Sequence, residues 1–206
     1  MNKSISILGA GESGVGAAIL AKKHEFNVFV SDKHLIKESY KKKLAQNNID
    51  FEEGKHTVNK ILESDLIVKS PGIPNENELI KKIVKNKKNL LSEIEFAHSY
   101  TKAKIIAITG TNGKTTTSLI IYKILKDAGL DVLLAGNIGN SFSYEISKRD
   151  YDIIVLEVSS FQLDNIVKFS PHISIILNIT PDHLDRYKGD FKNYIKSKLR
   201  ITLNQT

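Results

Sequence analysis

Short apolar runs of strand length recur along the chain, and stretches with helical spacing separate them. Several of these runs are continuously apolar rather than alternating, which is typical of parallel strands that are covered on both faces. Regular alternation of strand and helix predicts an α/β fold with parallel sheets. The predicted strands are SISIL (4–8), NVFVS (27–31), DLIVKS (65–70), KIIAIT (104–109), VLLAG (132–136), DIIVLEV (152–158) and ISIILNI (173–179).

The clearest helical pattern is KTTTSLIIYKILKDAG, residues 114–129. It ends at Gly129, and glycine is the usual residue just past a helix C-terminus. The helical period places five apolar side chains on one face, which we expect to be the buried face. These residues are Leu119, Ile120, Ile124, Leu125 and Ala128.

A second unit is predicted to begin near residues 95–103. Ser92 and Glu95 have the spacing of a capping box, which predicts that a helix begins there. The next strand has a glycine-rich loop of its own, so we expect a Rossmann-like domain over 1–97 and a P-loop-type ATPase domain with a parallel sheet over 98–206. Nucleotide-binding sheets usually have about five or six strands. Only four are predicted in the second domain, so we expect it to be incomplete and the chain to be a fragment.

Composition changes this picture little. The chain has no cysteine, which excludes disulfides and thiolate metal sites. The net charge of +7 comes mostly from lysine. The lysine clusters YKKKLAQNN and IKKIVKNKKN have helical spacing without interleaved aromatic residues, so we expect solvated faces and no nucleic-acid partner. The first apolar run is short and interrupted by glycine, which indicates neither a signal peptide nor a membrane span, and a cytoplasmic location is expected.

The stretch GAGESGVG follows the first predicted strand. Gly9, Gly11 and Gly14 form G-x-G-x-x-G, and Asp32 ends the second strand about twenty residues later, where an acid that binds ribose would lie. This arrangement predicts a Rossmann-like site with a pyrophosphate at a helix N-terminus. NAD, FAD and a UDP-sugar all fit such a site. The alternative is that the glycines only allow close packing of strand and helix.

The stretch ITGTNGKTT resembles a P-loop with a different spacing. Gly110 precedes Gly113 by three positions, whereas the standard G-x-x-x-x-G-K-[ST] motif would need glycine at Ile108. Backbone N–H groups of the turn can still hold phosphate oxygens. Lys114 can neutralise the β- and γ-phosphates, and the hydroxyl of Thr115 can reach Mg²⁺. The strand before the loop and the helix after it favour ATP or GTP binding.

Polar residues follow three other predicted strands. The segment SPGIP, residues 70–74, gives a stiff turn at a strand end where a ligand could bind, although a plain structural turn is equally supported. Glu157 ends an apolar run, and its carboxylate suits a metal ion or a structural hydrogen bond. Several polar side chains cluster beyond the last strand, which favours a site there. They are Asp182, His183, Asp185 and Arg186.

In this order along the chain, GTNGKTT, GNIG, LEVSSFQL, LNITPDHLDRY and YIKSKLRI closely resemble motifs of the Mur ligases, ATP-dependent amide-forming enzymes of peptidoglycan synthesis. Together, GAGESGVG, SPGIP and SSFQL are most similar to the member that adds D-glutamate to UDP-N-acetylmuramoyl-L-alanine. The similarity runs along essentially the whole chain. It implies that the first glycine-rich loop receives the UDP of a cell-wall precursor and that the second holds ATP.

The resemblance also implies a reaction in two steps. ATP phosphorylates the terminal carboxylate of UDP-N-acetylmuramoyl-L-alanine to an acyl phosphate, and the amine of D-glutamate then attacks. Two anions must approach each other, so cations are the main requirement. The family has a third domain that carries much of the D-glutamate site, and nothing in this chain corresponds to it. The chain alone is therefore expected not to form the amide bond.

Matching the family motifs to this chain implies a role for individual residues. The expected catalytic residues are Lys114, Glu157, His183 and Lys198, and Lys114 would steady the transferred phosphoryl group. The expected ATP-binding residues are Gly110, Thr111, Asn112, Gly113, Lys114, Thr115 and Thr116. Two Mg²⁺ ions are expected, one on Thr115 and Glu157 and one on His183, and Lys198 matches a lysine that CO₂ carbamylates into a metal-binding carboxylate. The expected substrate contacts are Gly11, Ser13, Asp32, Ser70 and Asn137.

Three other functions stay open on the sequence alone. Another ligase of the same superfamily would add a different amino acid or extend folate with glutamate. A nicotinamide-dependent oxidoreductase would use the first glycine-rich loop and Asp32, but it leaves Lys114, Glu157 and His183 without a role. A non-catalytic nucleotide-binding module is the third. The sequence does not determine the oligomeric state, and a monomer is favoured.

Overall fold

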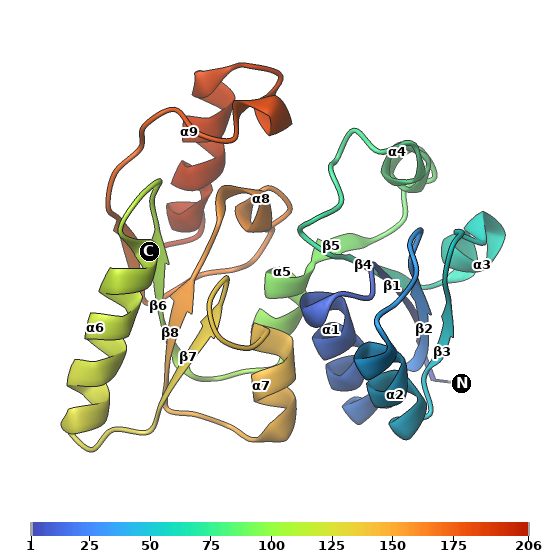
Figure 1. The fold of residues 1–206 in the computed structure, drawn as a ribbon, viewed down its shortest axis with the longest axis horizontal. Helices are drawn as coiled ribbons and strands as arrows, with labels where there is room; N and C mark the ends of the chain where they lie inside the picture. The colour runs from blue at the N-terminus through green and yellow to red at the C-terminus, as the bar shows by residue number, and fades with distance from the viewer. Residues whose placement is uncertain (1, 206) are drawn as a thin grey trace.

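Two parallel β-sheets form two units that lie against each other (Figure 1). The computed structural model describes residues 2–205. The first sheet has the strand order β3-β2-β1-β4-β5, and the second has the order β7-β8-β6-β9. Every pairing between these strands is parallel, which confirms the predicted α/β class. The strands are β1 (Ser4–Leu8), β2 (Asn27–Ser31), β3 (Asp50–Glu52), β4 (Leu66–Lys69), β5 (Leu90–Ser92), β6 (Lys104–Thr109), β7 (Val132–Gly136), β8 (Ile153–Glu157) and β9 (Ile173–Ile176).

Helices alternate with the strands along the chain. The α-helices are α1 (Glu12–Lys23), α2 (Glu38–Gln46), α3 (Val58–Glu63), α4 (Glu78–Lys85), α5 (Glu93–His98), α6 (Lys114–Asp127), α7 (Phe142–Lys148), α8 (Ser160–Leu163) and α9 (Phe191–Leu199). Two short 3₁₀ helices are η1 (Leu184–Tyr187) and η2 (Arg200–Thr202). All seven predicted strands are present. The sequence analysis missed β3 and β5, because runs of three residues carry too little periodicity to be recognised.

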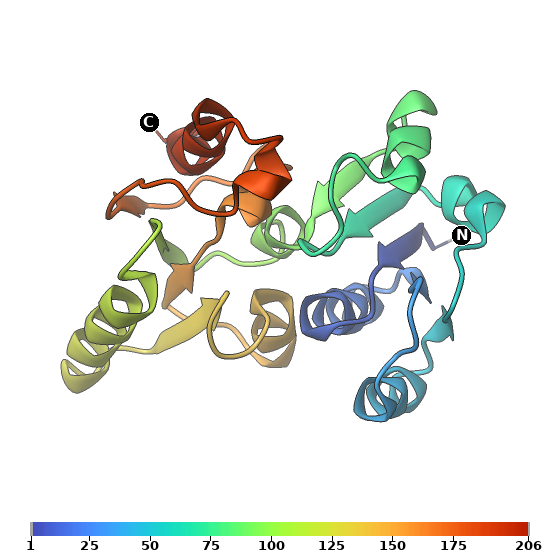
Figure 2. The same ribbon diagram turned by 45° about the horizontal axis from the view of Figure 1, so that its top comes forward.

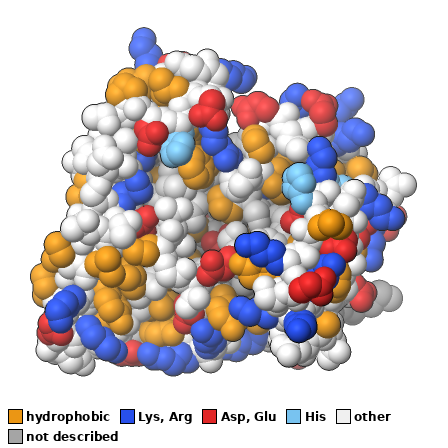
Figure 3. Space-filling model, in the orientation of Figure 1, with side chains coloured by type: hydrophobic (Ala, Val, Ile, Leu, Met, Phe, Trp, Pro, Cys, Tyr) orange, Lys and Arg blue, Asp and Glu red, His pale blue; other side chains and the backbone are white. Residues whose placement is uncertain are grey.

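The prediction for the buried face of α6 holds for Leu125 and is wrong for its other four residues. Leu119, Ile120 and Ile124 are 45%, 54% and 62% exposed. Apolar side chains gather on the surface over α6, at the lower left of Figure 3. The helix instead turns a neighbouring stripe toward β7 and β8. This stripe consists of Ser118, Ile121, Tyr122 and Leu125. Because α6 is apolar on most of its circumference, the helical period alone could not select the face that meets the sheet.

The two units meet where α1 packs against α7, and both views show these helices side by side between the sheets (Figures 1 and 2). Gly16 on α1 makes the close approach possible. A Cβ atom at this position would collide with the Oγ atom of Ser141 and lie 3.0 Å from the backbone nitrogen of Tyr144. One continuous cluster of buried apolar residues therefore runs through both units and includes Ala17, Phe96 and Phe142.

Helix α5 joins the units through two buried glutamates. The hydroxyl of Ser92 accepts a hydrogen bond from the backbone N–H of Glu95, so the predicted helix start is confirmed. The reciprocal half of the predicted capping box is not formed, because the Glu95 carboxylate instead accepts three backbone N–H groups of residues 167–169. Glu93 accepts hydrogen bonds from the N-terminus of α7, at Ser143 N and Ser141 Oγ. Both carboxylates thus hold backbone of the second unit.

The lysine-rich helices have the solvated faces that were predicted. On α4, Leu79, Ile80 and Ile83 are buried, whereas Lys81 and Lys82 are exposed. Within residues 2–205, no helix combines the length and the apolar character needed to cross a bilayer.

Candidate functional site

Both glycine-rich loops lie at the carboxyl ends of central strands. The first follows β1, which pairs with β2 on one side and with β4 on the other. The second follows β6, which pairs with β8 and β9. In open parallel sheets, ligands bind outside the carboxyl ends at the point where neighbouring connections diverge. Each unit therefore presents its loop at the place where the fold favours a ligand.

A cavity of about 490 Å³ opens beside the first loop. Four of the five predicted substrate-binding residues line it, and they come from three different strand ends. These are Gly11, Ser13, Asp32 and Ser70. The fifth, Asn137, belongs to the second unit and lies against Glu157 instead.

The three glycines of the first loop have different structural roles. Gly9 has φ = +89°, a left-handed conformation that favours glycine. A Cβ atom at Gly14 would collide with the carbonyl oxygen of Gly9, so Gly14 allows α1 to start directly behind the loop. Gly11 is the N-cap of α1 and has nothing within 4 Å of a Cβ position. The helix N-terminus therefore faces open space, where its N–H groups favour an anion.

Asp32 lies in the cavity wall, but its carboxylate is engaged with the backbone. One oxygen accepts the N–H of Ala10 at 2.6 Å, and the other accepts the N–H of His34 at 2.9 Å. In this arrangement Asp32 fixes the shape of the glycine-rich loop. A ribose contact, as expected for a dinucleotide site, would have to share these oxygens.

A polar network that the sequence does not signal lies at the edge of the same cavity. The Oγ atom of Ser31 lies 2.6 Å from Nδ1 of His56 and 2.7 Å from a carboxylate oxygen of Glu52. His56 lines the cavity, and burial lowers the pKa of its imidazole. No local motif in the sequence signals this residue, because its partner Ser31 is 25 positions away and the two come together only in the folded chain.

The second loop places a lysine amine over its own backbone. Gly113, the N-cap of α6, has φ = +82°, which only glycine adopts readily. The Nζ atom of Lys114 donates to the carbonyl oxygens of Gly110 and Thr111 at 2.9 and 2.8 Å. The amine is therefore held in the concave turn whose N–H groups are suited to phosphate.

Glu157 ends β8, and its side chain is 1% exposed. Its carboxylate accepts hydrogen bonds from the hydroxyl of Thr115 at 2.8 Å and from the amide of Asn137 at 3.0 Å. Both donors are uncharged. Within the described part of the chain, no lysine or arginine lies within ion-pair distance of this carboxylate.

A buried carboxylate without a cationic partner is costly, and a divalent cation would offset that cost. The hydroxyl of Thr115 and the carboxylate of Glu157 are hard oxygen donors of the kind that Mg²⁺ takes. Residues 2–205 contain no group of three or more His, Cys, Asp or Glu side chains able to hold a metal. The donors present therefore fit a Mg²⁺ ion that completes its shell with water and phosphate oxygens rather than a cage made by the protein.

Lys198 is buried beneath the second loop, with 2% of its surface exposed. Its Nζ atom donates to the carbonyl oxygen of Gly110 at 2.7 Å and lies 4.7 Å from the ring centre of Tyr194. Burial, with the nearby charge of Lys114, lowers the pKa of this amine to about 8. About a tenth of the amine is therefore uncharged at pH 7.

Two residues without an assigned role hold the second loop in place. The hydroxyls of Tyr194 and Thr111 lie 3.1 Å apart, and the side chain of Asn178 accepts the N–H of Asn112 at 2.9 Å. Both residues fall inside motifs that carry the family resemblance. Their function here is to connect α9 and the segment after β9 to the loop.

His183 is the one expected catalytic residue that stands apart from this cluster. It has φ = +50°, and 55% of its side chain is exposed. Its ring meets the edge of the Phe161 ring, with 5.5 Å between the ring centres. The segment before it is anchored to the second loop, because the N–H of Thr180 donates to Thr111 Oγ1 at 3.0 Å. The structure thus brings together Lys114, Thr115, Asn137, Glu157 and Lys198 and leaves His183 at their margin.

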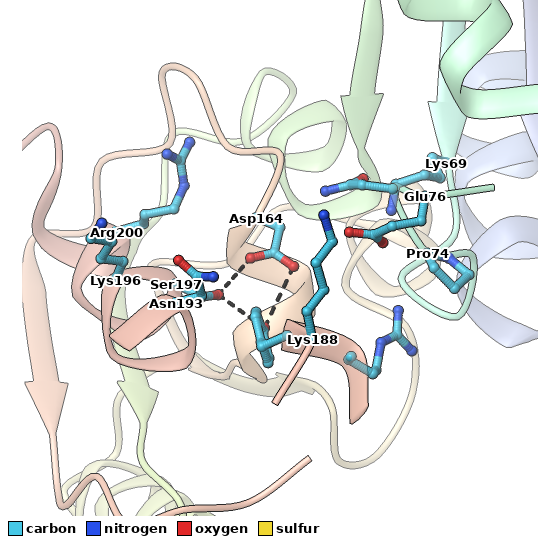
Figure 4. Close-up of a pocket in the computed structure, with 12 residues that line it drawn as sticks. Lys69, Pro74, Glu76, Asp164, Lys188, Asn193, Lys196, Ser197 and Arg200 are labelled. Atoms are coloured by element: carbon cyan, nitrogen blue, oxygen red, sulfur yellow. Dashed lines mark hydrogen bonds between the residues drawn. The ribbon is translucent and has the colours of Figure 1, made fainter. Parts of the chain in front are cut away.

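A polar cavity of about 350 Å³ lies between the two units (Figure 4). Lys69, Pro74 and Glu76 of the first unit face Asp164, Lys188 and Ser197 of the second. Lys69 is 3% exposed, and its Nζ atom donates to the carbonyl oxygen of Ile73 at 2.7 Å. Burial lowers the pKa of Lys69 to about 8.

Both units match domains of known proteins. Residues 4–79 match the MurD N-terminal domain, and residues 108–206 match the Mur ligase middle domain. The UDP-N-acetylmuramoylalanine–D-glutamate ligase of Bacteroides fragilis is 54% identical to this chain, over 99% of the chain and 46% of the relative. The ligase of the same name from Christiangramia forsetii is 50% identical, over 100% of the chain and 46% of the relative. The chain thus spans about 46% of the length of these curated relatives.

Solved structures share the arrangement of the two units. The UDP-N-acetylmuramate:L-alanyl-gamma-D-glutamyl-meso-diaminopimelate ligase from Neisseria meningitides has a TM-score of 0.65 and 20% identity, over 98% of this chain and 69% of that one. The UDP-N-acetylmuramate-alanine ligase from Thermotoga maritima has a TM-score of 0.62 and 21% identity. The match covers 98% of this chain and 47% of that one. At these identities the likeness shows a common fold, which agrees with the predicted Rossmann-like and ATPase-like units.

Proposed function

The chain belongs to the Mur ligase family, and on that premise we propose that it is the part of a D-glutamate-adding ligase that binds UDP-N-acetylmuramoyl-L-alanine and ATP. Members of this family are ATP-dependent amide-forming ligases. One observation carries the proposal: two glycine-rich loops lie at the carboxyl ends of two separate sheets, one beside a cavity and one beside a buried carboxylate. The two curated relatives support D-glutamate over other amino acids.

The first cavity is proposed to receive the UDP moiety. The open N-terminus of α1 at Gly11 would take the diphosphate, because its N–H groups point at that space and the helix dipole favours negative charge. Ser13 and Ser70 offer hydroxyls at the same edge. Asp32 would act mainly through the loop that it fixes. The rest of the precursor would then extend toward the second unit.

The second loop is proposed to bind ATP. Backbone N–H groups between Gly110 and Thr116 would hold phosphate oxygens at the N-terminus of α6. The amine of Lys114 would exchange its two carbonyl partners for the β- and γ-phosphates, and its charge would offset the repulsion between the γ-phosphate and the substrate carboxylate. Thr111 and Asn112 would keep the loop in shape through Tyr194 and Asn178.

Thr115 and Glu157 are proposed to hold one Mg²⁺ ion, because together they present a hydroxyl and an uncompensated buried carboxylate. His183 and Lys198, the latter as a carbamate, would hold a second. Bound Mg²⁺ would supply charge neutralisation on the phosphate oxygens during phosphoryl transfer. Asn137 orients the Glu157 carboxylate through its amide and would also touch the substrate.

Carbamylation of Lys198 is proposed because its amine meets the chemical requirement. CO₂ reacts with an uncharged amine, and the pKa of about 8 leaves about a tenth of the side chain uncharged at pH 7. The product carries a negative charge, so it would be stabilised by the neighbouring Lys114 and by a cation. The modification would convert the buried amine beneath the second loop into an anionic ligand.

The D-glutamate site and the closing step are proposed to need sequence that the curated relatives have outside the matched 46%. Binding is therefore the direct test for this chain. We would titrate it calorimetrically with UDP-N-acetylmuramoyl-L-alanine and repeat the titration with NAD present. The proposal expects binding that NAD does not weaken. Competition by NAD would instead assign the first cavity to a dinucleotide, and absence of binding would contradict the proposed substrate.

A second titration tests the ATP loop with a matched pair of lysine variants. Replacement of Lys114 by methionine is expected to lower the affinity for Mg²⁺-ATP by at least about tenfold, because a charge contact to the phosphates is lost. Replacement of Lys126, in the last turn of the same helix, should leave that affinity unchanged. Equal affinities in the two variants would argue against this role of Lys114.

A further inference from the structure

Cations from both units hold the carbonyl groups of one loop. Residues 70–74 follow β4 and form part of the wall of the cavity beside the first glycine-rich loop. Lys69 of the same unit donates to the carbonyl oxygen of Ile73 at 2.7 Å. Arg186, on η1 of the second unit, donates to the carbonyl oxygen of Pro71 at 3.0 Å. The wall of a first-unit cavity is thus held in part by a side chain of the second unit.

The same guanidinium contacts the aromatic ring that meets His183. The Cζ atom of Arg186 lies 4.5 Å from the ring centre of Phe161, and the ring of His183 meets that of Phe161 nearly perpendicularly. A planar guanidinium can stack on a ring with its face while it donates hydrogen bonds from its edge. Arg186 therefore makes both contacts at once. Its guanidinium joins Pro71 to Phe161 and, through that ring, to the side chain of His183, and its backbone N–H also donates to the carbonyl oxygen of His183 at 3.1 Å.

This contact is suited to transmit movement rather than to resist it. In the described residues, Arg186 has no carboxylate within ion-pair distance and uses its edge on a backbone carbonyl. A single such hydrogen bond is weak in net terms, so occupancy of the neighbouring cavity can shift it. Lys69 holds the other end of the loop from a buried position, so displacement would concentrate at Pro71.

We propose that Arg186 is a positioning residue that couples occupancy of the sugar-nucleotide cavity to the orientation of His183 at the margin of the ATP loop. The inference rests on the proposed function, because it takes the first cavity as the site of a nucleoside diphosphate. It assigns a joint role to SPGIP, SSFQL and DHLDRY, three segments that are far apart in sequence. The ligase would thereby sense its acceptor substrate before phosphoryl transfer.

The test follows the imidazole resonances of His183 by NMR while UDP is added to the 206-residue chain. A His183→Gln variant assigns the signals. In the wild-type chain, UDP should shift them. In Arg186→Ala, UDP should bind with an affinity within about threefold of wild type, but the shift of the His183 signals should fall at least about fivefold, since the path between the sites is broken. Arg186→Lys keeps a donor for Pro71 and should recover part of the shift.

Arg149→Ala is the matched control. This arginine also lies over a tyrosine ring, at 3.8 Å, but it pairs with Asp131 on the far side of the second unit. Its loss should leave the UDP-induced shift of His183 intact. Phe161→Leu gives a second break in the path without touching Pro71, and it serves if Arg186→Ala fails to fold. It should also suppress the shift.

Three results would overturn the inference, and they differ in meaning. If UDP binds and shifts His183 equally in wild type, Arg186→Ala and Phe161→Leu, the coupling is refuted and the proposed function stands. If the wild-type chain does not bind UDP, the proposed first site fails and the coupling fails with it. UDP that binds wild type without moving the His183 signals also refutes the coupling alone.

Discussion

The hydroxyl of Thr115 donates to the carboxylate of Glu157 at 2.8 Å, so the first turn of α6 is tied to the last residue of β8. Both partners are oxygen donors of the kind that Mg²⁺ prefers. Magnesium binding would exchange this hydrogen bond for bonds to the metal and would relieve a buried charge that now has only uncharged donors.

Replacing Glu157 with glutamine is therefore expected to remove the effect of Mg²⁺ on ATP binding while the fold survives. Glutamine keeps the shape of the side chain and removes a buried charge, so the free energy of unfolding should fall by no more than about 1 kcal/mol. The affinity for ATP in the presence of Mg²⁺ should drop by about tenfold or more, toward its value in a chelator. Calorimetric titration with and without Mg²⁺ measures the difference.

Glu145→Gln is the control for that experiment. Glu145 is also nearly buried, but it pairs with Lys148 on α7 and takes no part in the site. Its variant should keep the full Mg²⁺ response. A Glu157→Gln chain that keeps the response as well would show that Glu157 is not a ligand.

Because of Lys198, the free energy of unfolding of the chain should rise as the pH rises above about 8. Its pKa in the folded chain is about 8, below the ordinary 10.5, because burial disfavours the ammonium form. The unfolded chain therefore binds this proton more tightly. Relative to Lys198→Met, the wild type should be least stable below about pH 8 and should gain about 1–2 kcal/mol as the pH rises toward about 9.5.

Urea unfolding of both chains at about pH 7 and about pH 9.5 measures this change. Lys69 also has a pKa of about 8, but it is present in both proteins, so its contribution cancels. A constant difference for Lys198→Met would contradict the lowered pKa.

The same amine should take up CO₂. With ¹³C-labelled bicarbonate, the wild-type chain should show a carbamate carbon resonance, which should grow as the uncharged fraction rises from about a tenth at pH 7 to about a half at pH 8. The signal should be absent from Lys198→Arg and retained in Lys69→Arg. Loss of the signal in Lys69→Arg alone would move the modification to the cavity between the units.

Replacement by alanine should lower the folding stability at Gly16 much more than at Gly11. In Gly16→Ala, the added Cβ would collide with Ser141 and push α1 away from α7, which should cost about 1–3 kcal/mol of folding free energy. In Gly11→Ala, the Cβ meets nothing within 4 Å, so stability should change by less than about 1 kcal/mol. Thermal unfolding separates the two.

Titration with UDP completes that comparison. Gly11→Ala should weaken UDP binding, because its methyl group occupies the space in front of the helix N-terminus. Equal stability of the two variants would argue against the close packing of α1 and α7. Unchanged UDP affinity in Gly11→Ala would argue against diphosphate at this helix.

The two glutamates of α5 should differ sharply when each is replaced by glutamine. Glu95 accepts three backbone N–H groups through both carboxylate oxygens, and glutamine would put an amide donor in place of one of these acceptors, so Glu95→Gln should lose about 2–3 kcal/mol of folding free energy. Burial raises the pKa of Glu93, so its charged form is costly in the folded chain and the raised pKa removes stability above the ordinary pKa. Glu93→Gln should therefore be neutral or stabilising at pH 7. Urea unfolding of the two variants compares them, and similar losses would contradict the difference.

Much of the site could be predicted because strand ends are readable from sequence. Each apolar run that reaches its glycine or acidic residue defines a carboxyl end, and parallel strands bring those ends to one edge. That is why Gly11, Asp32 and Ser70 line one cavity and why Thr115 meets Glu157. The roles of these residues in binding and catalysis stay predictions.

The features that could not be predicted from the sequence depend on contacts between segments that are far apart along the chain. The spacing of Ser92 and Glu95 predicts a local capping box. The carboxylate of Glu95 instead accepts backbone N–H groups that lie more than seventy positions later in the chain. The stripe of α6 that is buried depends on the sheet beneath it, and periodicity cannot choose between two apolar faces. The hydrogen bond from Arg186 to Pro71 spans 115 positions, and no pattern within either segment indicates it.

The collision that reserves position 16 for glycine also has a mechanical consequence. Helices α1 and α7 are in close contact at this point. Rotation of the two units about this contact would therefore disturb its packing less than separation of the helices would. We expect the contact to act as a pivot. A rotation about this contact would change the spacing between residues 70–74 and η1, which the hydrogen bond from Arg186 to Pro71 joins across the units.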